Sequence, residues 1–457
     1  MQLRAHRLHL SSAVRTPART PSRSIPIRHA SSTSFYNSPG LRNTLGALAL
    51  LASGAAVTAY YLDSRSAIHR YVIPPLLRVT LDAEQAHRFA VRTLASGLAP
   101  RDLGSDDEKL QIEIWGHRLP NPVSLAAGFD KDAEAIEGLF KLGFGWVEIG
   151  SVTPKAQPGN PSPRVFHLSE DLAMINRYGF PSVGFPLVVS RLRSFLSLRR
   201  DPSSPQLLSV NVGKNKSSPP ESVTDYVEGV RTLGPLADVL VINVSSPNTP
   251  GLRGLQTRGL LVGLLTAARK ERDAIQKREI GTQGFKWERP KLVVKIAPDL
   301  NEVELQDIAD VVLETGIDGV IVSNTTIQRP PHLISGNAEE KGGLSGAPLL
   351  PLSLSALRTL RAYLPASVPI FGCGGISTGA DALEFARSGA SAVQLYTSFG
   401  YGGPGVPRRI KDEIVSELAK EGTTWEAVAI PGHLREEVLM KEGEKLRRAA
   451  EKLKAID

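Results

Sequence analysis

Eight short apolar runs follow one another between residues 119 and 396, and most are separated by segments long enough to form a helix. Runs that are apolar at nearly every position are typical of parallel strands covered on both faces. Eight such units in about 280 residues predict the α/β class and a (β/α)8 TIM barrel over residues 110–420. No Gly-x-Gly-x-x-Gly turn follows the first run, which argues against a dinucleotide-binding Rossmann unit. The expected strands are residues 123–127, 146–149, 207–212, 239–244, 292–296, 319–323, 370–372 and 392–396.

A longer apolar run, residues 45–62, precedes the barrel and contains no charged residue. A helix that crosses a bilayer needs ~20 such residues. Tyr60 and Tyr61 stand at the end of the run, where interfacial aromatic side chains are common. We therefore expect a single N-terminal transmembrane helix over residues 43–63. A buried core helix is the alternative interpretation, because the run is only moderately hydrophobic.

The first 42 residues contain seven arginines, no lysine and no acidic residue, and they are rich in Ser and Thr. This composition is typical of a mitochondrial transit peptide, with a generic basic tail as the alternative. Arginines before the anchor and mixed charges after it predict an N-terminus in the matrix. The barrel would then face the intermembrane space from the mitochondrial inner membrane.

Residues 70–99 are expected to form a small two-helix module between the anchor and the barrel. Pro74 predicts the start of one short helix, and Asp82 with Gln85 fits a capping box for a second helix that ends near Gly97. Such amphipathic helices after an anchor could lie in the lipid headgroup layer, or simply pack on the main domain. The expected apolar face of the second helix consists of Ala86, Phe89, Ala90 and Leu94.

The net charge of +8 does not indicate a nucleic-acid partner. Seven of the 54 Lys and Arg residues lie in the acid-free first 42 residues, which leaves 47 basic against 46 acidic side chains. No basic patch with interleaved aromatic residues remains. The single cysteine, Cys373, excludes an intrachain disulfide framework and disfavours a cysteine metal site.

Two segments have no predicted function. Residues 276–289 form an insert, and residues 434–457 are rich in Glu, Lys and Arg, which predicts a solvated helical tail.

Small polar residues follow the apolar runs at the points where the runs end. The most notable stretch, residues 243–252, reads Asn-Val-Ser-Ser-Pro-Asn-Thr-Pro-Gly-Leu. Because the chemistry of a barrel lies at the carboxyl ends of its strands, we expect these residues to surround one mouth. There Ser246 could accept a proton, provided that Thr249 or a water chain relays it onward. An ordinary turn is the alternative interpretation.

Residues after the last two strands predict a phosphate site. Gly375 follows the seventh run, and Tyr396 and Thr397 follow the eighth. Backbone N–H groups at this place in barrels commonly bind phosphate. Lys295 ends the fifth run, and a lysine can stabilise the electron density that a flavin ring gains on reduction. The combination suits flavin mononucleotide (FMN).

As a set, these stretches resemble the dihydroorotate dehydrogenases, specifically their membrane-bound, quinone-reducing class 2. The resemblance runs from about residue 70 to about residue 418. Ser246 resembles the serine that class 2 has at the position of the catalytic base, where the cytosolic class uses cysteine. Cys373 lies on a different loop and is not that base. The stretches that carry the resemblance are residues 126–131, 147–155, 160–166, 175–180, 211–216, 243–249, 294–299, 323–326, 342–346 and 394–397.

The resemblance implies oxidation of (S)-dihydroorotate to orotate in de novo pyrimidine (UMP) biosynthesis, with FMN as hydride acceptor and ubiquinone as final electron acceptor. Ser246 would take a proton from C5 as a hydride leaves C6, with Lys131 and Lys295 as further catalytic residues; no metal is implied. The implied FMN-binding residues are Ala127, Gly128, Ser151, Asn211, Asn243, Lys295, Ser323, Gly346, Gly375, Tyr396 and Thr397. The implied substrate-binding residues are Lys131, Asn176, Arg177, Tyr178, Gly179, Phe180, Asn243, Asn248, Asn324 and Thr325. The quinone would enter from the lipid through the helices over residues 70–99, along Leu77, Ala86, His87, His167 and Tyr396.

Two departures concern the quinone tunnel. His167 stands where the family often has arginine, and residues 398–403 are richer in glycine than expected. One alternative function keeps the barrel and FMN but uses another substrate or a soluble acceptor. A second alternative is a membrane-tethered binding protein on an inactive barrel, although a decayed site should have lost at least one of Lys131, Ser246 and Lys295.

Overall fold

The computed structural model describes residues 39–198, 206–276 and 289–429. Most of the predicted transit peptide, the predicted tail helix and nearly all of the insert lie outside these residues. The chain divides into two compact units, Met1–Ala56 and Val57–Asp457, which are described separately.

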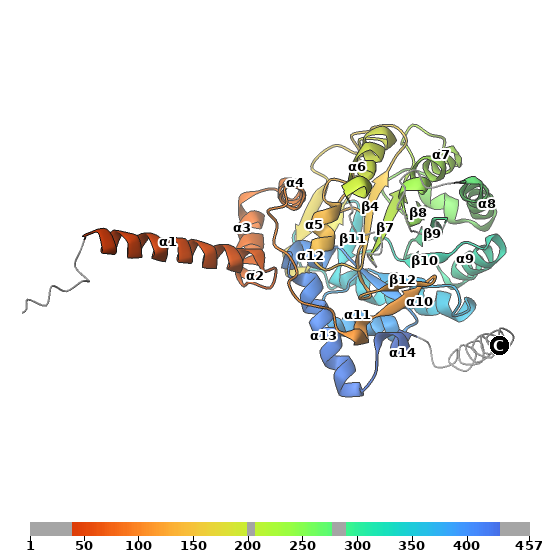
Figure 1. The fold of residues 1–457 in the computed structure, drawn as a ribbon. Helices are drawn as coiled ribbons and strands as arrows, with labels where there is room; N and C mark the ends of the chain where they lie inside the picture. The colour runs from red at the N-terminus through yellow and green to blue at the C-terminus, as the bar shows by residue number, and fades with distance from the viewer. Residues whose placement is uncertain (1–38, 199–205, 277–288, 430–457) are drawn as a thin grey trace, which may run out of the picture. The chain divides into compact units, whose positions relative to one another are not determined.

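The second unit contains a closed barrel of eight parallel strands (Figure 1). All eight expected strands are confirmed, with ends that differ by up to three residues because short strands pass gradually into their loops. Around the barrel the strands follow one another in chain order, and β13 closes the circle by pairing with β3. The strands are β3 (Val123–Leu125), β4 (Trp146–Val152), β7 (Leu207–Val212), β8 (Val239–Asn243), β9 (Lys291–Ile296), β10 (Gly319–Val322), β12 (Ile370–Cys373) and β13 (Ala392–Leu395).

Helices surround the barrel and bury one apolar face each (Figure 1). Helix α9 shows how the sequence sets their ends: the Asn301 and Glu304 side chains form a capping box at its start, and Gly316 ends it in a left-handed conformation. The helices of this part are α5 (Ile136–Lys141), α6 (Phe185–Leu198), α7 (Thr224–Leu233), α8 (Arg258–Ala274), α9 (Glu302–Thr315), α10 (Leu350–Tyr363), α11 (Gly379–Arg387), α12 (Thr397–Gly402), α13 (Val406–Glu421) and α14 (Trp425–Ala429).

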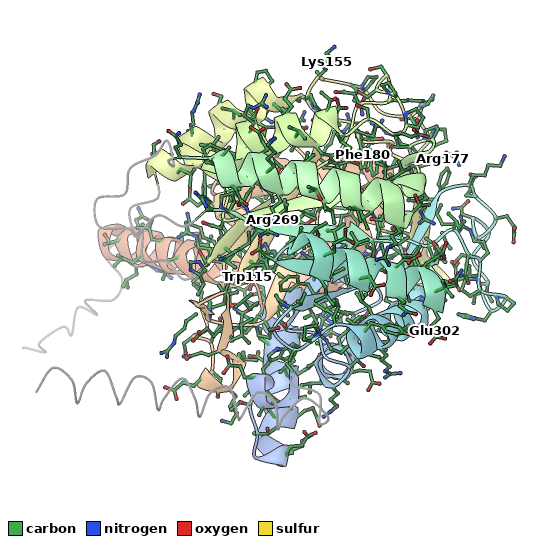
Figure 2. All side chains as sticks on the ribbon, turned by 90° about the vertical axis from the view of Figure 1, so that its right-hand side faces the viewer. Trp115, Lys155, Arg177, Phe180, Arg269 and Glu302 are labelled. Carbon is green, nitrogen blue, oxygen red and sulfur yellow. The ribbon has the colours of Figure 1, made fainter. Side chains whose placement is uncertain are left out.

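A hairpin of β1 (Ile112–Ile114) and β2 (His117–Leu119), which the apolar pattern did not predict, closes the amino-terminal end of the barrel. Trp115 at its turn packs edge-on against Trp146 and Phe371. In Figure 2, Trp115 lies well apart from Phe180, which belongs to the opposite, carboxyl-terminal end.

A second small sheet stands at the carboxyl-terminal end and was also not predicted. It consists of β5 (Val165–Leu168), β6 (Ala173–Asn176) and β11 (Gly343–Gly346), all antiparallel. Pairing of Asn176 with Gly343 joins two loops that are far apart in the sequence. The sheet therefore forms a wall at the mouth of the barrel.

Three short α-helices lie between α1 (Pro39–Leu62) and the barrel in the chain: α2 (Ile68–Tyr71), α3 (Ile73–Thr80) and α4 (Ala83–Ala95). Helix α3 has Pro74 in its first turn, and the Asp82 side chain caps α4 by accepting from the N–H groups of Glu84 and Gln85. The expected apolar face of α4 is buried only in part. Val91 and Leu94 are buried, whereas Phe89 is half-exposed. Helix α2 was not predicted.

Helix α1 (Pro39–Leu62) covers residues 43–62 of the transmembrane helix expected over residues 43–63. Its segment Arg42–Leu62 has a mean hydropathy of 1.6 and is long and apolar enough to cross a membrane, and no residue of its most apolar window is buried.

Candidate active site

A pocket with an empty volume of about 1040 Å³, including its open mouth, lies at the carboxyl-terminal end of the barrel. The loops after β3, β8, β10, β12 and β13 line it, together with residues at the ends of β4 and β9 and the wall formed by β6 and β11. Most of the predicted cofactor residues line this pocket: Ala127, Gly128, Ser151, Asn243, Lys295, Ser323, Gly346, Gly375, Tyr396 and Thr397. The predicted substrate residues Lys131, Asn176, Tyr178, Gly179, Phe180, Asn248, Asn324 and Thr325 line it as well, and so does Ser246.

One predicted cofactor residue and one predicted substrate residue lie outside the lining. Asn211 sits directly behind it, where its Oδ1 accepts from the Ser151 hydroxyl and from Asn243 Nδ2, the latter at 3.1 Å. Arg177 pairs with Glu340 at 2.6 Å and lies over the Phe166 ring, so its side chain belongs to the outer rim (Figure 2).

The floor of the pocket is built on a buried carboxylate that sequence reasoning missed. Glu148 in β4 is fully buried, and its Oε1 lies 3.8 Å from Lys295 Nζ. Asn211 Nδ2 donates to Oε1 at 2.7 Å, and Gln394 Nε2 donates to Oε2 at 2.5 Å. The sequence did carry a signal for this group: Glu148 is a charged residue inside an apolar run, and a buried acid needs a cation or hydrogen-bond donors beside it.

The Ser246 loop is held by side chains from neighbouring strands. Ser246 is 7 % exposed and its Oγ accepts from Asn248 N–H at 3.3 Å. Arg253 donates to the carbonyls of Ser245 and Thr325, and its guanidinium pairs with Asp299 at 2.7 Å. The Arg253–Asp299 pair therefore ties the loop after β8 to the loop after β9, and the bond to Thr325 O ties it to the loop after β10.

Lys131 stands at one side of the pocket. Its Nζ donates to Gly128 O at 2.7 Å and lies 4.2 Å from the Tyr178 ring centroid. Burial lowers the pKa of Lys131 to about 7. His87 of α4 completes the group: its Nε2 is 2.7 Å from Phe129 O and its Nδ1 is 3.4 Å from Lys131 Nζ. Burial and Lys131 lower the pKa of His87 to about 3, so His87 is neutral and its Nδ1 accepts from Lys131.

Several features of the pocket fit a polar ligand that carries a phosphate. Thr325 Oγ1, Gln394 Oε1 and Ser398 Oγ all belong to its lining, and these buried atoms have no hydrogen-bond partner within the described residues. Such atoms are normally satisfied in the functional state. Gly346 and Gly375 have positive φ, and a Cβ on either would collide with the backbone behind it. Only glycine fits there, and it leaves backbone groups facing the pocket.

The predicted quinone residues are spread over neighbouring elements. Tyr396 lines the pocket, and its ring lies against Gly128. His167 of β5 stacks obliquely on Tyr401 of α12, with ring centroids 5.6 Å apart. The guanidinium of Arg78 in α3 lies 5.2 Å from the centroid of the same ring and donates to the backbone carbonyl of Tyr401. Leu77 lies next to Arg78 in α3, and Ala86 next to His87 in α4.

Barrel and pocket together define a TIM-barrel enzyme with its active site at the carboxyl ends of the strands. Residues 109–418 match the family model of dihydroorotate dehydrogenase. The chain is 47% identical over 409 residues to the mitochondrial dihydroorotate dehydrogenase (quinone) of Schizosaccharomyces pombe, which covers 83% of this chain and 89% of that protein. The enzyme of the same name from Mus musculus is 47% identical over 394 residues, covering 85% of this chain and 97% of the relative. The chain thus belongs to the dihydroorotate dehydrogenase family and, within it, to the quinone-dependent class.

A crystal structure of DHODH from Eimeria tenella in complex with ferulenol has the same fold. It superimposes with a TM-score of 0.75 at 44% identity, over 79% of this chain and 99% of that one.

Proposed function

We propose that this protein oxidises (S)-dihydroorotate to orotate, with FMN as the hydride acceptor and ubiquinone as the final electron acceptor. The family membership implies a flavin. The choice of ligands rests on the pocket: Lys131, Ser246 and Lys295 surround one cavity, and its lining includes buried polar atoms that have no hydrogen-bond partner among the residues that the structure describes.

The phosphate of FMN would lie against the loops after β12 and β13. Gly346, Gly375 and Thr397 offer backbone groups and a hydroxyl there. The flavin ring would lie between the glycine-rich end of β3 and the asparagine group on the floor. Lys295 would contribute the positive charge beside the ring. Bound FMN supplies the two-electron acceptor that the hydride from C6 requires.

The substrate would lie on the other side of the pocket, against the loops after β6, β8 and β10. Lys131 would pair with the carboxylate of dihydroorotate, and the amides of Asn176, Asn248 and Asn324 would bind its ring. The side chain of Arg177 would act from the rim, and only its backbone is close to the pocket.

Ser246 would take the proton from C5. A serine hydroxyl holds its proton too tightly to act alone, so the proton must pass onward. Thr249 Oγ1 is buried three residues along the same loop and has no hydrogen-bond partner within the described residues. It would relay the proton from Ser246 through an intervening water and give up its own hydroxyl proton in turn.

The reduced site would be reoxidised by a quinone that approaches between α3, α4 and α12, past His87, His167 and Tyr396. The outer side of this region is apolar: Leu76, Val79 and Phe89 are at least half-exposed. Together with the apolar helix α1 and the mitochondrial relatives, this supports a single-pass protein of the mitochondrial inner membrane whose barrel faces the intermembrane space.

The test is to purify the full chain in detergent, release its cofactor with acid and identify it by mass, and then to assay dihydroorotate with a ubiquinone analogue. Release of FMN and quinone-dependent formation of orotate are expected. A protein without flavin would support an inactive barrel, and flavin without turnover would point to another substrate or acceptor.

A further inference from the structure

Helix α4 contacts the substrate side of the pocket through an ion pair as well as through His87. Glu84 in its first turn accepts from Arg164 Nη2 at 2.6 Å and from Arg164 Nε at 3.0 Å. The two side chains are only 19 % and 13 % exposed. A bidentate, largely buried Arg–carboxylate pair fixes both partners more firmly than an exposed pair does.

Arg164 also donates hydrogen bonds to the loop that supports the pocket. Its Nη1 donates to Pro158 O at 2.6 Å and to Asn160 O at 3.0 Å. Asn160 in turn donates from its backbone to Tyr178 O at 2.8 Å and from its side chain to Asn248 O at 3.2 Å. The pair is therefore connected by direct hydrogen bonds to two residues that line the pocket.

Arg164 also contacts the Tyr178 ring itself. Its guanidinium lies 5.2 Å from the ring centroid, and Lys131 Nζ lies 4.2 Å from the same centroid. Two cations over one aromatic ring are each attracted to it but repel each other. Glu84 is one of the carboxylates that offset this repulsion: the charges of Asp132 and then Glu84 favour the protonated form of Lys131, whereas that of Arg164 opposes it. Of these two carboxylates, Glu84 is the one that pairs with Arg164.

We propose that Glu84 and Arg164 are positioning residues that dock α4 against the substrate pocket and hold Tyr178 and Lys131 in the geometry that binds dihydroorotate and orotate. The inference rests on the proposed function for the identity of these ligands. It makes α4, the helix assigned to quinone access, part of the substrate-binding structure.

The test measures the dissociation constant of orotate by calorimetry on the full, flavin-loaded chain. Glu84→Gln is expected to weaken orotate binding by at least about fivefold, the lower end of couplings between linked sites. Glu271→Gln is the matched control, because Glu271 forms a bidentate pair with Arg231 on the outside of the barrel. It is expected to leave the constant unchanged. The KM for dihydroorotate should rise with the dissociation constant, while kcat stays within about twofold, as expected for an effect on substrate binding.

The effect of Glu84→Gln on orotate affinity is measured again in a Tyr178→Leu protein, which shows whether that effect depends on the Tyr178 ring. There, Glu84→Gln is expected to add less than about a twofold change. Arg164→Lys, which keeps the charge but loses the bidentate geometry, serves as the second variant if Glu84→Gln does not load flavin. An unchanged orotate affinity in a folded Glu84→Gln or Arg164→Lys protein overturns the inference, as does an effect of full size in the Tyr178→Leu background. Absence of orotate binding by the unaltered protein would instead count against the proposed function.

Discussion

The ammonium group of Lys295 lies 3.8 Å from Oε1 of Glu148, a carboxylate with no solvent exposure at all. Asn211 and Gln394 donate to the same carboxylate, and both also stand behind or within the pocket lining. The positive charge that would face a flavin is thus held by a negative charge fixed in the barrel core. Because Glu148 is fully buried and cannot be hydrated, its charge depends on Lys295 and on the two amide donors.

Glu148→Gln is expected to make the reduction potential of the bound flavin more positive. The substitution removes a negative charge beside Lys295, so the lysine stabilises the added electron density of the reduced ring more strongly. Spectroelectrochemical titration of the variant and the unaltered protein measures the difference. Glu271→Gln on the barrel exterior serves as the control. An unchanged or more negative potential in Glu148→Gln would show that Glu148 does not balance Lys295.

Ser246→Ala is expected to lower kcat by at least about 100-fold at neutral pH while the flavin remains bound, as for the loss of a positioned general base. Ser245→Ala is the matched comparison, since the Ser245 hydroxyl bonds to Asn243 and Asn324 but does not line the pocket. Its effect should be smaller than tenfold. Near-normal turnover of Ser246→Ala would remove this residue from the mechanism.

Orotate binding is expected to weaken as the pH rises above about 7. Burial lowers the pKa of Lys131 to about 7, so the free protein loses the cation that pairs with the ligand carboxylate. The dissociation constant should be about tenfold larger at pH 8 than at pH 6. Lys131→Arg remains charged and should give a flat profile. A flat profile in the unaltered protein would assign the carboxylate to another partner.

The lowered pKa of Lys131 also makes the folding stability depend on pH. The folded pKa of Lys131 lies below its ordinary value of 10.5, so the unfolded chain binds the additional proton. The contribution of this group to folding stability therefore rises with pH between about 7 and 10.5.

Asp102→Asn is expected to destabilise the fold by about 3 kcal/mol without changing the site, because Arg408 and Lys411 would then share one carboxylate, Asp106, and one buried positive charge would be uncompensated. Asp102 binds both Arg408 and Lys411, and the three side chains are at most 5 % exposed. Chemical denaturation followed by tryptophan fluorescence measures the change. Asp307→Asn, which affects an exposed pair with Arg258, is the control and should cost under about 1 kcal/mol. A loss of folding stability under about 1 kcal/mol for Asp102→Asn would show that the ion pairs of Asp102 with Arg408 and Lys411 do not stabilise the fold.

The barrel could be predicted from the sequence because each strand is buried on both faces and appears as an uninterrupted apolar run. The residues lining the pocket were largely predictable for a related reason: carboxyl ends of parallel strands meet at one edge, so Ser246, Lys295 and Asn324 had to converge. The hairpin around Trp115 escaped prediction because its two short strands, Ile-Glu-Ile and His-Arg-Leu, interrupt their apolar residues with charged and polar ones and form no apolar run.

Contacts between distant segments could not be predicted. The pairing of Glu84 with Arg164, and of Arg253 with Asp299, joins charged residues whose separation in the sequence carries no periodic signal. The sheet of β5, β6 and β11 depends on the pairing of residue 343 with residue 176 across the mouth of the barrel. Such pairings follow from the closed tertiary structure rather than from local pattern.

The most direct test of the proposed function is anaerobic mixing of the purified protein with dihydroorotate, followed at the flavin absorbance band, with a ubiquinone analogue added afterwards. Bleaching by dihydroorotate and recovery on addition of quinone are the predicted results. Bound flavin that is not bleached by dihydroorotate would contradict the substrate assignment and the role of Ser246. Bleaching without recovery would contradict quinone as the acceptor.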